Sequence, residues 1–120
     1  MVLVDTSVWI DHLRKGNAHL EKLLLDIDVA CHPFIIGEIA CGNLKNRSEI
    51  LSLLHSLPLA PAIENEEILL FIERNRLSGI GIGLIDVHLL ASSRLAHIPI
   101  WTRDKRLYNA SVSLQMAYIC

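Results

Sequence analysis

The hydrophobic positions follow two patterns that alternate along the chain. Short apolar runs at 2–4, 29–31 and 99–102 are typical of buried strands. Residues 58–61 fit a short strand or an extended connector, and 113–116 fit a last strand. The segments with apolar residues at helical spacing are predicted as helices: 6–15, 17–25, 33–42, 48–57, 64–77, 84–95 and 104–108. Strands alternating with helices predict an α/β fold, in which a parallel sheet has helices on both faces.

The composition indicates one globular domain over residues 1–120. Of the 120 residues, 52% are hydrophobic and 20% are charged, which is too apolar for a disordered chain. No apolar run approaches the roughly 20 residues of a membrane span, and no basic segment of a signal peptide opens the sequence. We therefore expect a cytoplasmic protein. Three cysteines without a CxxC pair predict buried thiols rather than a zinc or redox site: Cys31, Cys41 and Cys120.

Four of the 13 acidic residues occupy positions that call for an explanation. Asp5 directly follows the first strand and Asp104 follows the strand at 99–102, although each could simply be a helix N-cap. Glu38 and Asp86 lie in helical segments among apolar neighbours. A lone buried carboxylate costs several kcal/mol unless it is paired or bound to a metal, and an unseen basic partner is the alternative for Glu38.

We expect these four acids to meet at one edge of the sheet, because ligands of parallel sheets bind beyond the carboxyl ends of the strands. Four carboxylates about 6 Å apart repel by roughly 3 kcal/mol per pair at an effective dielectric near 20. A domain that is stable by about 5–15 kcal/mol needs protons or cations to offset this repulsion. Hard oxygen ligands select Mg²⁺ or Mn²⁺ over zinc, and such an ion can activate water and neutralise charge on a phosphate.

Four motifs, in this order across nearly the whole chain, resemble the PIN-domain family, with the greatest similarity to its VapC-type bacterial toxins. They are VDTSVWI at 4–10, Glu38 in a short apolar helix, GLIDVHLLAS at 83–92 and TRDKRL at 102–107. The resemblance implies a three-layer α/β/α sandwich with a central, mainly parallel sheet, forming a single nuclease domain. It also implies a Mg²⁺- or Mn²⁺-dependent endoribonuclease, the toxin of a type II toxin–antitoxin pair, which hydrolyses RNA with a metal-activated water.

Site residues follow from the resemblance motif by motif. Asp5, Glu38, Asp86 and Asp104 match the acidic quartet, which implies both catalytic and metal-binding roles. We expect Asp5 and Asp86 to be the main ligands, and the other two acids to hold a second ion or orient metal-bound waters. Thr102 matches a supporting hydroxyl residue that would bond to an acid or a water.

The net charge of −2 does not by itself indicate nucleic-acid binding, because RNA affinity depends largely on neutralising phosphates. Leaving out the four acids changes this balance to +2. Two basic groups lie near them in sequence and are candidates for RNA contact: Arg103, Lys105 and Arg106, and Arg14 and Lys15. Ordinary solvated charge is the alternative for all five, and Arg103 could instead pair with a site acid.

The resemblance further implies two protein partners, a small antitoxin that covers the cleft and a second copy of the chain in a homodimer. The leucine-rich helices at 17–25 and 48–57 offer apolar area for either contact, although core packing explains their leucines equally well.

Rival functions fit the sequence less well. A receiver-type phosphoacceptor domain needs paired acids after the first strand, and a haloacid-dehalogenase-like phosphatase needs a second Asp where Ser7 stands. The six histidines are interpreted as structural, because His88 points away from Asp86 on its helix and no common face joins His12, His19, His55 and His97. The remaining alternative is a catalytically silent PIN-like module that binds RNA or protein. Four mutually repelling acids argue against it, since a silent module has no use for them.

Overall fold

The computed structural model describes residues 1–119. The three strands are β1 (Val2–Val4), β2 (Val29–Ala30) and β3 (Ile100–Trp101). The helices are α1 (Thr6–Lys15), α2 (Ala18–Leu25), α3 (Pro33–Ala40), α4 (Arg47–Ser56), α5 (Asn65–Arg74), α6 (Leu84–Ala96) and α7 (Lys105–Ser113).

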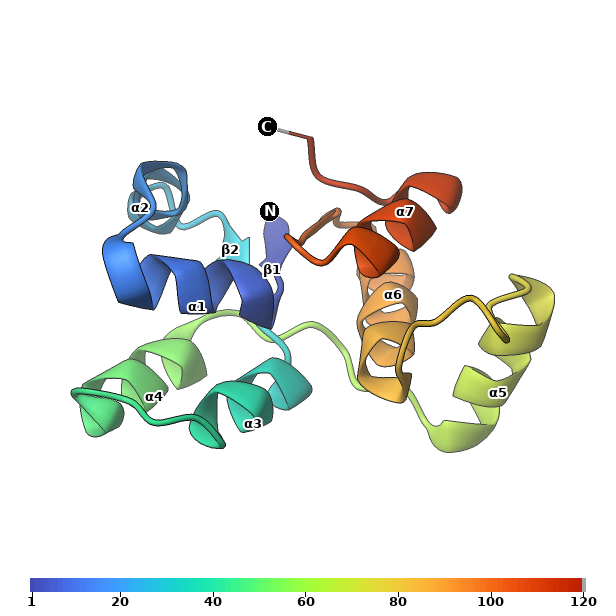
Figure 1. Ribbon diagram of the computed structural model, residues 1–120, viewed down its shortest axis with the longest axis horizontal. Helices are drawn as coiled ribbons and strands as arrows, with labels where there is room; N and C mark the ends of the chain where they lie inside the picture. Colours follow the sequence, from blue (N-terminus) through green and yellow to red (C-terminus); the bar gives the residue numbers. More distant parts are fainter. Residues whose placement is uncertain (120) are drawn as a thin grey trace.

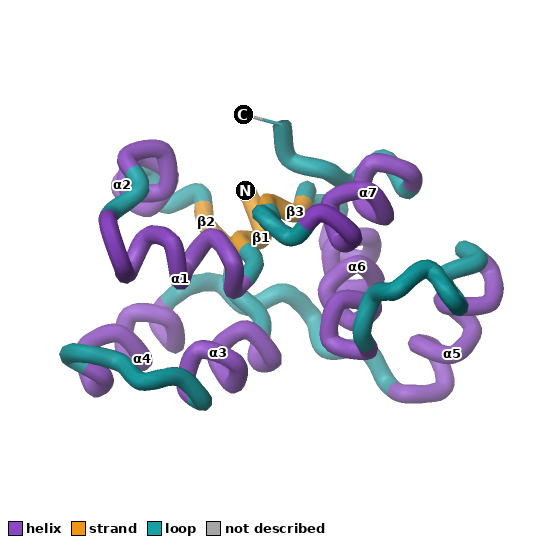
Figure 2. Tube along the Cα trace, in the orientation of Figure 1, coloured by secondary structure: helices purple, strands orange, loops and turns teal. Residues whose placement is uncertain are grey.

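The strands form one parallel sheet in the order β2-β1-β3. In the central strand, Leu3 is in register with Ala30 on one side and with Ile100 on the other. Helices α1 to α4 lie on one side of the strands and α5 to α7 on the other (Figure 1), with the short sheet between the two groups (Figure 2). The α/β sandwich with a parallel sheet that the sequence predicted is therefore confirmed.

The hydrophobic core is centred on β1, all of whose residues are buried. Leu3 and Val4 have no exposed surface, and neither do Leu89 and Leu90 of α6. A strand covered on both faces carries apolar residues at every position rather than at alternate ones, which explains the uninterrupted run that predicted it.

Four helices begin at a residue whose side chain accepts a backbone N–H of the first turn. These N-caps are Asp5 for α1, Asn17 for α2, His32 for α3 and Asp104 for α7. Each cap satisfies one of the donors that a helix leaves unpaired at its start. Two of the acids selected from the sequence are thus helix caps as well as residues at strand ends.

The C-terminal part of the fold differs from the sequence prediction. Helix α7 extends well beyond the predicted 104–108, because its buried face continues to Ala110. The predicted strand at 113–116 is wrong, since the helix occupies the beginning of that range. Strand-like pairing comes later, where Ala117 forms an isolated parallel bridge with Ile100.

Two other segments also deviate in detail. Helix α5 stops short of the predicted end at 77, and Arg76 just beyond it has a φ of +54°, which no helix can continue. Residues 58–61 are a connector rather than a full strand, since only Leu59 pairs with the sheet, through a bridge to Cys31.

The cysteines divide into different environments. Cys31 is buried as predicted, and burial raises the pKa of its thiol to about 11. The prediction for Cys41 is wrong, because this residue is exposed just after α3. Cys120 lies outside the described residues. Within residues 1–119, no helix is both long enough and apolar enough to cross a membrane.

His32 joins the start of α3 to α6 in the core. It is 1% exposed, its Nδ1 accepts the backbone N–H of Phe34, and its Nε2 lies 3.1 Å from Ser92 Oγ. Burial and, to a smaller extent, the charge of His88 together lower the pKa of His32 to about 4.

We expect this histidine to make the fold sensitive to acid. Between pH 4 and the ordinary histidine pKa near 6.5, the unfolded chain binds a proton at His32 that the folded chain does not. Its contribution is therefore complete above pH 6.5 and is lost as the pH falls towards 4, by on the order of 3 kcal/mol. Urea unfolding of wild type and His32→Asn at pH 7.5 and 4.5 measures it, because Asn retains a helix-capping side chain. An equal loss of stability in both proteins would contradict this role.

Candidate active site

Asp5 lies at the junction between β1 and α1, with only 6% of its surface exposed. Its Oδ2 accepts hydrogen bonds from the hydroxyls of Ser7 and Thr102, each 2.8 Å away. The backbone N–H of Asp5 donates to the carbonyl of Trp101 at the end of β3. The central strand, the helix and the neighbouring strand therefore fix the position of this carboxylate.

Thr102 connects Asp5 to Asp104. Its hydroxyl donates to Asp5 and accepts the backbone N–H of Asp104 at 3.0 Å. In parallel, Ser7 Oγ accepts the backbone N–H of Arg103 at 2.9 Å. Asp104 is exposed at the start of α7. The segment after β3 is thus fastened to the start of α1, which brings the acids that follow two adjacent strands to the same edge of the sheet.

Glu38 approaches this edge from α3, but it is not buried. The helix buries Ile35, Ile36 and Ile39 and leaves Glu38 exposed, so the expectation of an apolar environment on all sides was wrong. The position next to α1 is nevertheless defined, because Thr6 Oγ1 donates to Glu38 Oε1 at 2.7 Å. The partner of this carboxylate is a hydroxyl rather than the basic residue considered as the alternative.

Asp86 approaches from α6 and is half-buried in the first turn of that helix. Its Oδ2 accepts the N–H of Gly83 at 3.4 Å. Burial raises the pKa of Asp86, and the negative charges of Asp5, Asp104 and Glu38 raise it further, while the Gly83 N–H acts in the opposite direction. Asp5, Asp104 and Glu38 therefore lie close enough to Asp86 to act on it electrostatically.

The donor set fits a hard divalent cation. Within the described part of the chain, the ion pairs of lysine and arginine involve Asp11 and none of the four acids. Across residues 1–119, no three Asp, Glu, His or Cys side chains are gathered tightly enough to form a complete metal site as they stand. The acids thus supply oxygen ligands and negative charge that no lysine or arginine neutralises, and binding an ion requires side-chain adjustment.

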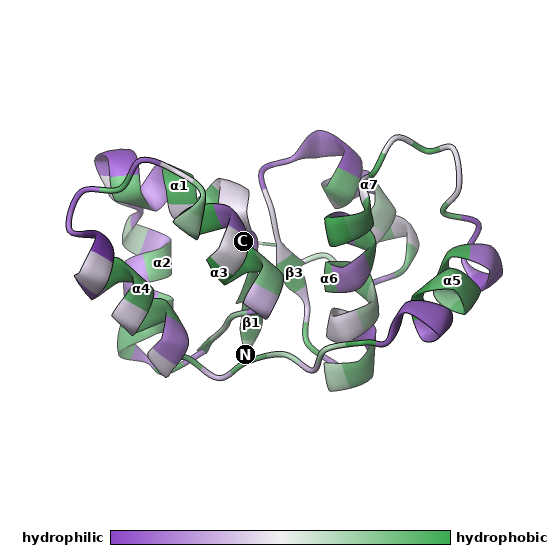
Figure 3. Ribbon diagram, turned by 90° about the horizontal axis from the view of Figure 1, so that it is seen from below, coloured by the Kyte–Doolittle hydropathy of each residue, from purple (hydrophilic) through white to green (hydrophobic). Residues whose placement is uncertain are grey.

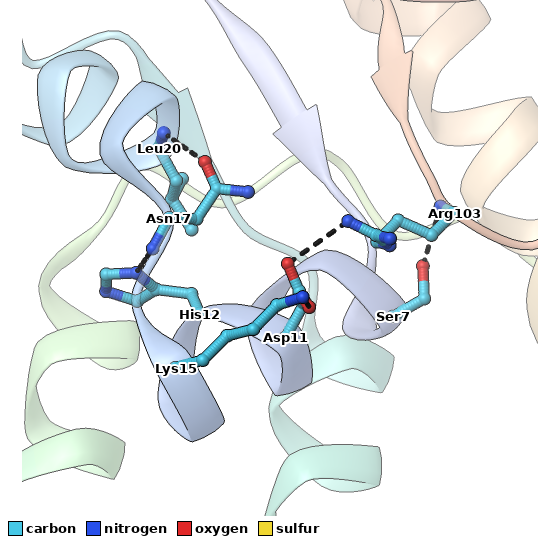
Figure 4. Close-up of polar contacts among 7 residues, drawn as sticks. All are labelled: Ser7, Asp11, His12, Lys15, Asn17, Leu20 and Arg103. Atoms are coloured by element: carbon cyan, nitrogen blue, oxygen red, sulfur yellow. Dashed lines mark hydrogen bonds and ion pairs between the residues drawn. The ribbon is translucent and has the colours of Figure 1, made fainter.

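The basic residues predicted to contact RNA lie around this edge of the sheet and differ in their contacts and exposure. Arg103 Nη1 forms an ion pair with Asp11 Oδ2 at 3.1 Å, and Lys15 Nζ lies 3.4 Å from Asp11 Oδ1 (Figure 4). Lys105 is exposed at the start of α7, in the hydrophilic segment after β3 that Figure 3 shows in purple. Arg14 lines a groove beside α1 together with Glu38.

Arg106 has a structural contact that the sequence did not indicate. Its Nη1 donates to the carbonyl of Gly81 at 3.4 Å. Gly81 has a φ of +86°, and a Cβ at this position would come within 2.8 Å of the Arg106 guanidinium. Gly81, in the loop before α6, therefore provides both the left-handed backbone conformation and the space that the Arg106 side chain occupies.

Sequence reasoning overlooked two residues of the site, Ser7 and Asp11. Ser7 could have been suspected, because a hydroxyl two residues after an N-cap aspartate can donate to it. The sequence indicates a role for Asp11 only weakly, through its i,i+4 spacing to Lys15, which favours an ion pair on a helix. The pairing of Asp11 with Arg103 spans 92 positions and could not be predicted without the tertiary structure.

The chain has relatives among known proteins that match over most of its length. Residues 2–112 match the model of the PIN domain. Ribonuclease VapC32 from two strains of Mycobacterium tuberculosis is 47% identical over 108 residues, which cover 89% of this chain and 87% of the relative.

Solved structures share the fold. The structure of PAE2754 from Pyrobaculum aerophilum superimposes with a TM-score of 0.69 and 16% identity, over 98% of this chain and 87% of that one. FitAcB from Neisseria gonorrhoeae gives a TM-score of 0.66 and 21% identity, over 93% and 94% of the two chains. Together with the acids that follow β1 and β3, these matches establish that the chain belongs to the PIN-domain family, in its VapC branch.

Proposed function

We propose that this protein is an endoribonuclease and the toxin of a type II toxin–antitoxin pair. One observation carries the proposal: Asp5, Glu38 and Asp104 lie close enough to Asp86 of α6 to act on it electrostatically, and no lysine or arginine of residues 1–119 is paired to any of the four. The 47% identity to a protein named Ribonuclease VapC32 supports RNA as the substrate. We extend the proposal to the whole of residues 1–120 as one nuclease domain acting in the cytoplasm.

Asp5, Glu38, Asp86 and Asp104 would hold a Mg²⁺ or Mn²⁺ ion, with Asp5 and Asp86 as its main ligands. When bound, such an ion supplies an activated water and offsets the charge that develops on the phosphate. Asp5 is suited to fixed coordination, because the hydroxyls of Ser7 and Thr102 restrain it. The exposed Glu38 and Asp104 would orient waters or hold a second ion.

The basic residues around the acids would bind the RNA phosphates on either side of the cut. Arg103 and Lys15 lie along the flank of α1, and Lys105 is exposed at the start of α7. Arg106 and Arg14 complete this set of RNA-contact candidates. Neutralisation of phosphates by such residues supplies most of the affinity of proteins for nucleic acids.

A cleavage assay tests the function. Purified chain free of any antitoxin is incubated with total RNA and Mg²⁺ or Mn²⁺, and the new RNA ends are mapped by sequencing. Defined internal cuts are expected of an endoribonuclease. RNA that is retarded in a gel but stays intact would instead favour the alternative, a catalytically silent PIN-like binding module.

A groove beside the acids supports an antitoxin as a protein partner. It has a volume of about 450 Å³ and lies between α1, α3 and the start of α4. Its lining is mostly apolar, including Ile10 and Leu13, which are 40% and 36% exposed, and Arg14 and Lys45 are its basic lining residues. Because Glu38 also lines this groove, a peptide bound there would reach the site and block it.

We expect Leu13→Asn to weaken binding of the cognate antitoxin by roughly tenfold, because it removes apolar contact from the groove without adding charge. RNA cleavage by the free protein should remain. Titration calorimetry measures the affinity, and Leu25→Asn is the matched control, since Leu25 on α2 is 84% exposed and outside the groove. Equal affinities of these two variants would place the antitoxin elsewhere.

We also propose that the chain forms a homodimer. Apolar side chains are exposed on the α5–α6 side of the molecule, with Leu69 55%, Leu70 48% and Leu95 57% exposed. An exposed apolar area of this kind supports a contact with another protein surface. Leu70 and Leu95 line one shallow depression between these helices, which gives the area a defined shape.

A further inference from the structure

Asp11 bridges two cations beside the acidic site. It lies one helical turn after Ser7 on α1, so both residues face the segment that follows β3 (Figure 4). Its two oxygens have separate partners, Arg103 Nη1 at 3.1 Å and Lys15 Nζ at 3.4 Å. One carboxylate therefore sets the direction of two long side chains that would otherwise sample many rotamers.

Arg103 is held at both ends. Its backbone N–H donates to Ser7 Oγ, and Ser7 in turn donates to the buried Asp5. Its guanidinium reaches Asp11. In sequence Arg103 stands directly between Thr102 and Asp104. The guanidinium is thus fixed relative to the acids by the same contacts that order the site.

The exposed fractions of the three side chains show that the two positive charges face the solvent. The Arg103 side chain is 55% exposed and that of Lys15 69%, whereas that of Asp11 is 17% exposed behind them. The net charge of the three residues is +1. A guanidinium has five N–H donors in a planar fork, so an ion pair through one nitrogen leaves donors for a phosphate oxygen.

We propose that Asp11 is a positioning residue, which holds Arg103 in the orientation that binds an RNA phosphate next to the one that is cut. The inference rests on the proposed function and adds a specific role to a residue outside the acidic quartet. Asp11 itself contacts no RNA. It acts through Arg103 by reducing the number of rotamers that must be ordered when RNA binds.

Charge alone predicts the opposite effect of losing Asp11. Removing a negative charge beside two cations strengthens the attraction of any phosphate, so binding would become tighter and more dependent on salt. Removing a positioning contact makes binding weaker. The direction of the change therefore separates the two explanations.

The experiment compares Asp11→Ala, Arg103→Gln and the double variant with wild type. Binding of a fluorescent single-stranded RNA oligonucleotide is measured in EDTA at several salt concentrations, and kcat and KM are measured with Mg²⁺. We expect Asp11→Ala to weaken binding about three- to tenfold and to raise KM with little change in kcat, as loss of uniform binding does. In the Arg103→Gln background, Asp11→Ala should weaken binding no further, and the loss of its negative charge beside Lys15 can only strengthen it.

Asp26→Ala is the matched control, since it removes the same charge at the exposed end of α2, away from the ion pairs. Exposed ion pairs add little to stability, so Asp11→Ala should fold, and thermal unfolding verifies this. Binding by Asp11→Ala that equals or exceeds that of Asp26→Ala would overturn the inference, as would a loss of binding on Asp11→Ala that persists without Arg103. A wild-type chain that neither binds nor cuts RNA would instead refute the proposed function, and this inference with it.

Discussion

Replacing Asp5 with asparagine is expected to reduce RNA cleavage by roughly a hundredfold or more. Even a residue that only orients a metal ligand is worth about 10–100-fold, and we propose Asp5 itself as a ligand. Asparagine removes the negative charge and leaves a carbonyl oxygen, a far weaker ligand for a hard divalent cation.

The fold of Asp5→Asn should survive, which makes the variant informative. Asparagine caps helices about as well as aspartate, and its carbonyl can still accept the hydrogen bonds from Ser7 and Thr102. Loss of one of four repelling charges also removes a source of instability. Without metal, we therefore expect a thermal midpoint equal to or above that of wild type.

Initial rates of cleavage of a labelled RNA and thermal unfolding, measured on the same preparations, test this prediction. Asp26→Asn on the surface controls for the change in net charge and should cut at the wild-type rate. A folded Asp5→Asn protein with full activity would refute both the role of Asp5 and the nuclease proposal built on it.

Removal of divalent cations is expected to have an equally large effect. Treatment with EDTA should reduce cleavage to the background, and excess Mg²⁺ or Mn²⁺ should restore it, because hard oxygen donors favour these ions. A silent binding module would show neither response.

Metal binding should also be visible without RNA. An ion that binds only the folded chain stabilises it by about 2.7 kcal/mol at a hundred times its Kd, so the thermal midpoint should rise with Mg²⁺ concentration. In Asp5→Asn this rise should be much smaller, which links the stabilisation to the acids rather than to salt. Equal rises in the two proteins would argue that the ion binds elsewhere.

Much of the fold could be predicted because the hydrophobic pattern and the helix-capping residues indicated the same boundaries between strands and helices. The run 2–4 is apolar throughout since β1 is covered on both faces, and Asp5 follows it both as a strand end and as a helix cap. The same coincidence marks Asp104 after β3. Where strand end and N-cap coincide, sequence alone assigns an acid to the functional edge of a parallel sheet.

The errors share a cause, which is dependence on contacts distant in sequence. Apolar neighbours of Glu38 suggested burial, but α3 packs through three isoleucines on one face and turns the glutamate outward. The length of α7 depends on Ala110 packing into the core, which no local pattern shows. Asp11 resembles an ordinary surface acid until Arg103 is brought beside it.

The helix N-termini at the site reduce the electrostatic repulsion among its carboxylates. Helices α1 and α7 begin at Asp5 and Asp104, and Asp86 lies in the first turn of α6, so three helices direct their amino ends at one group of carboxylates. Each such end carries roughly half a positive charge. The backbone therefore supplies a permanent counter-charge that is present before any ion arrives. We therefore expect the chain to fold without a divalent ion, and such an ion to be required only for cleavage.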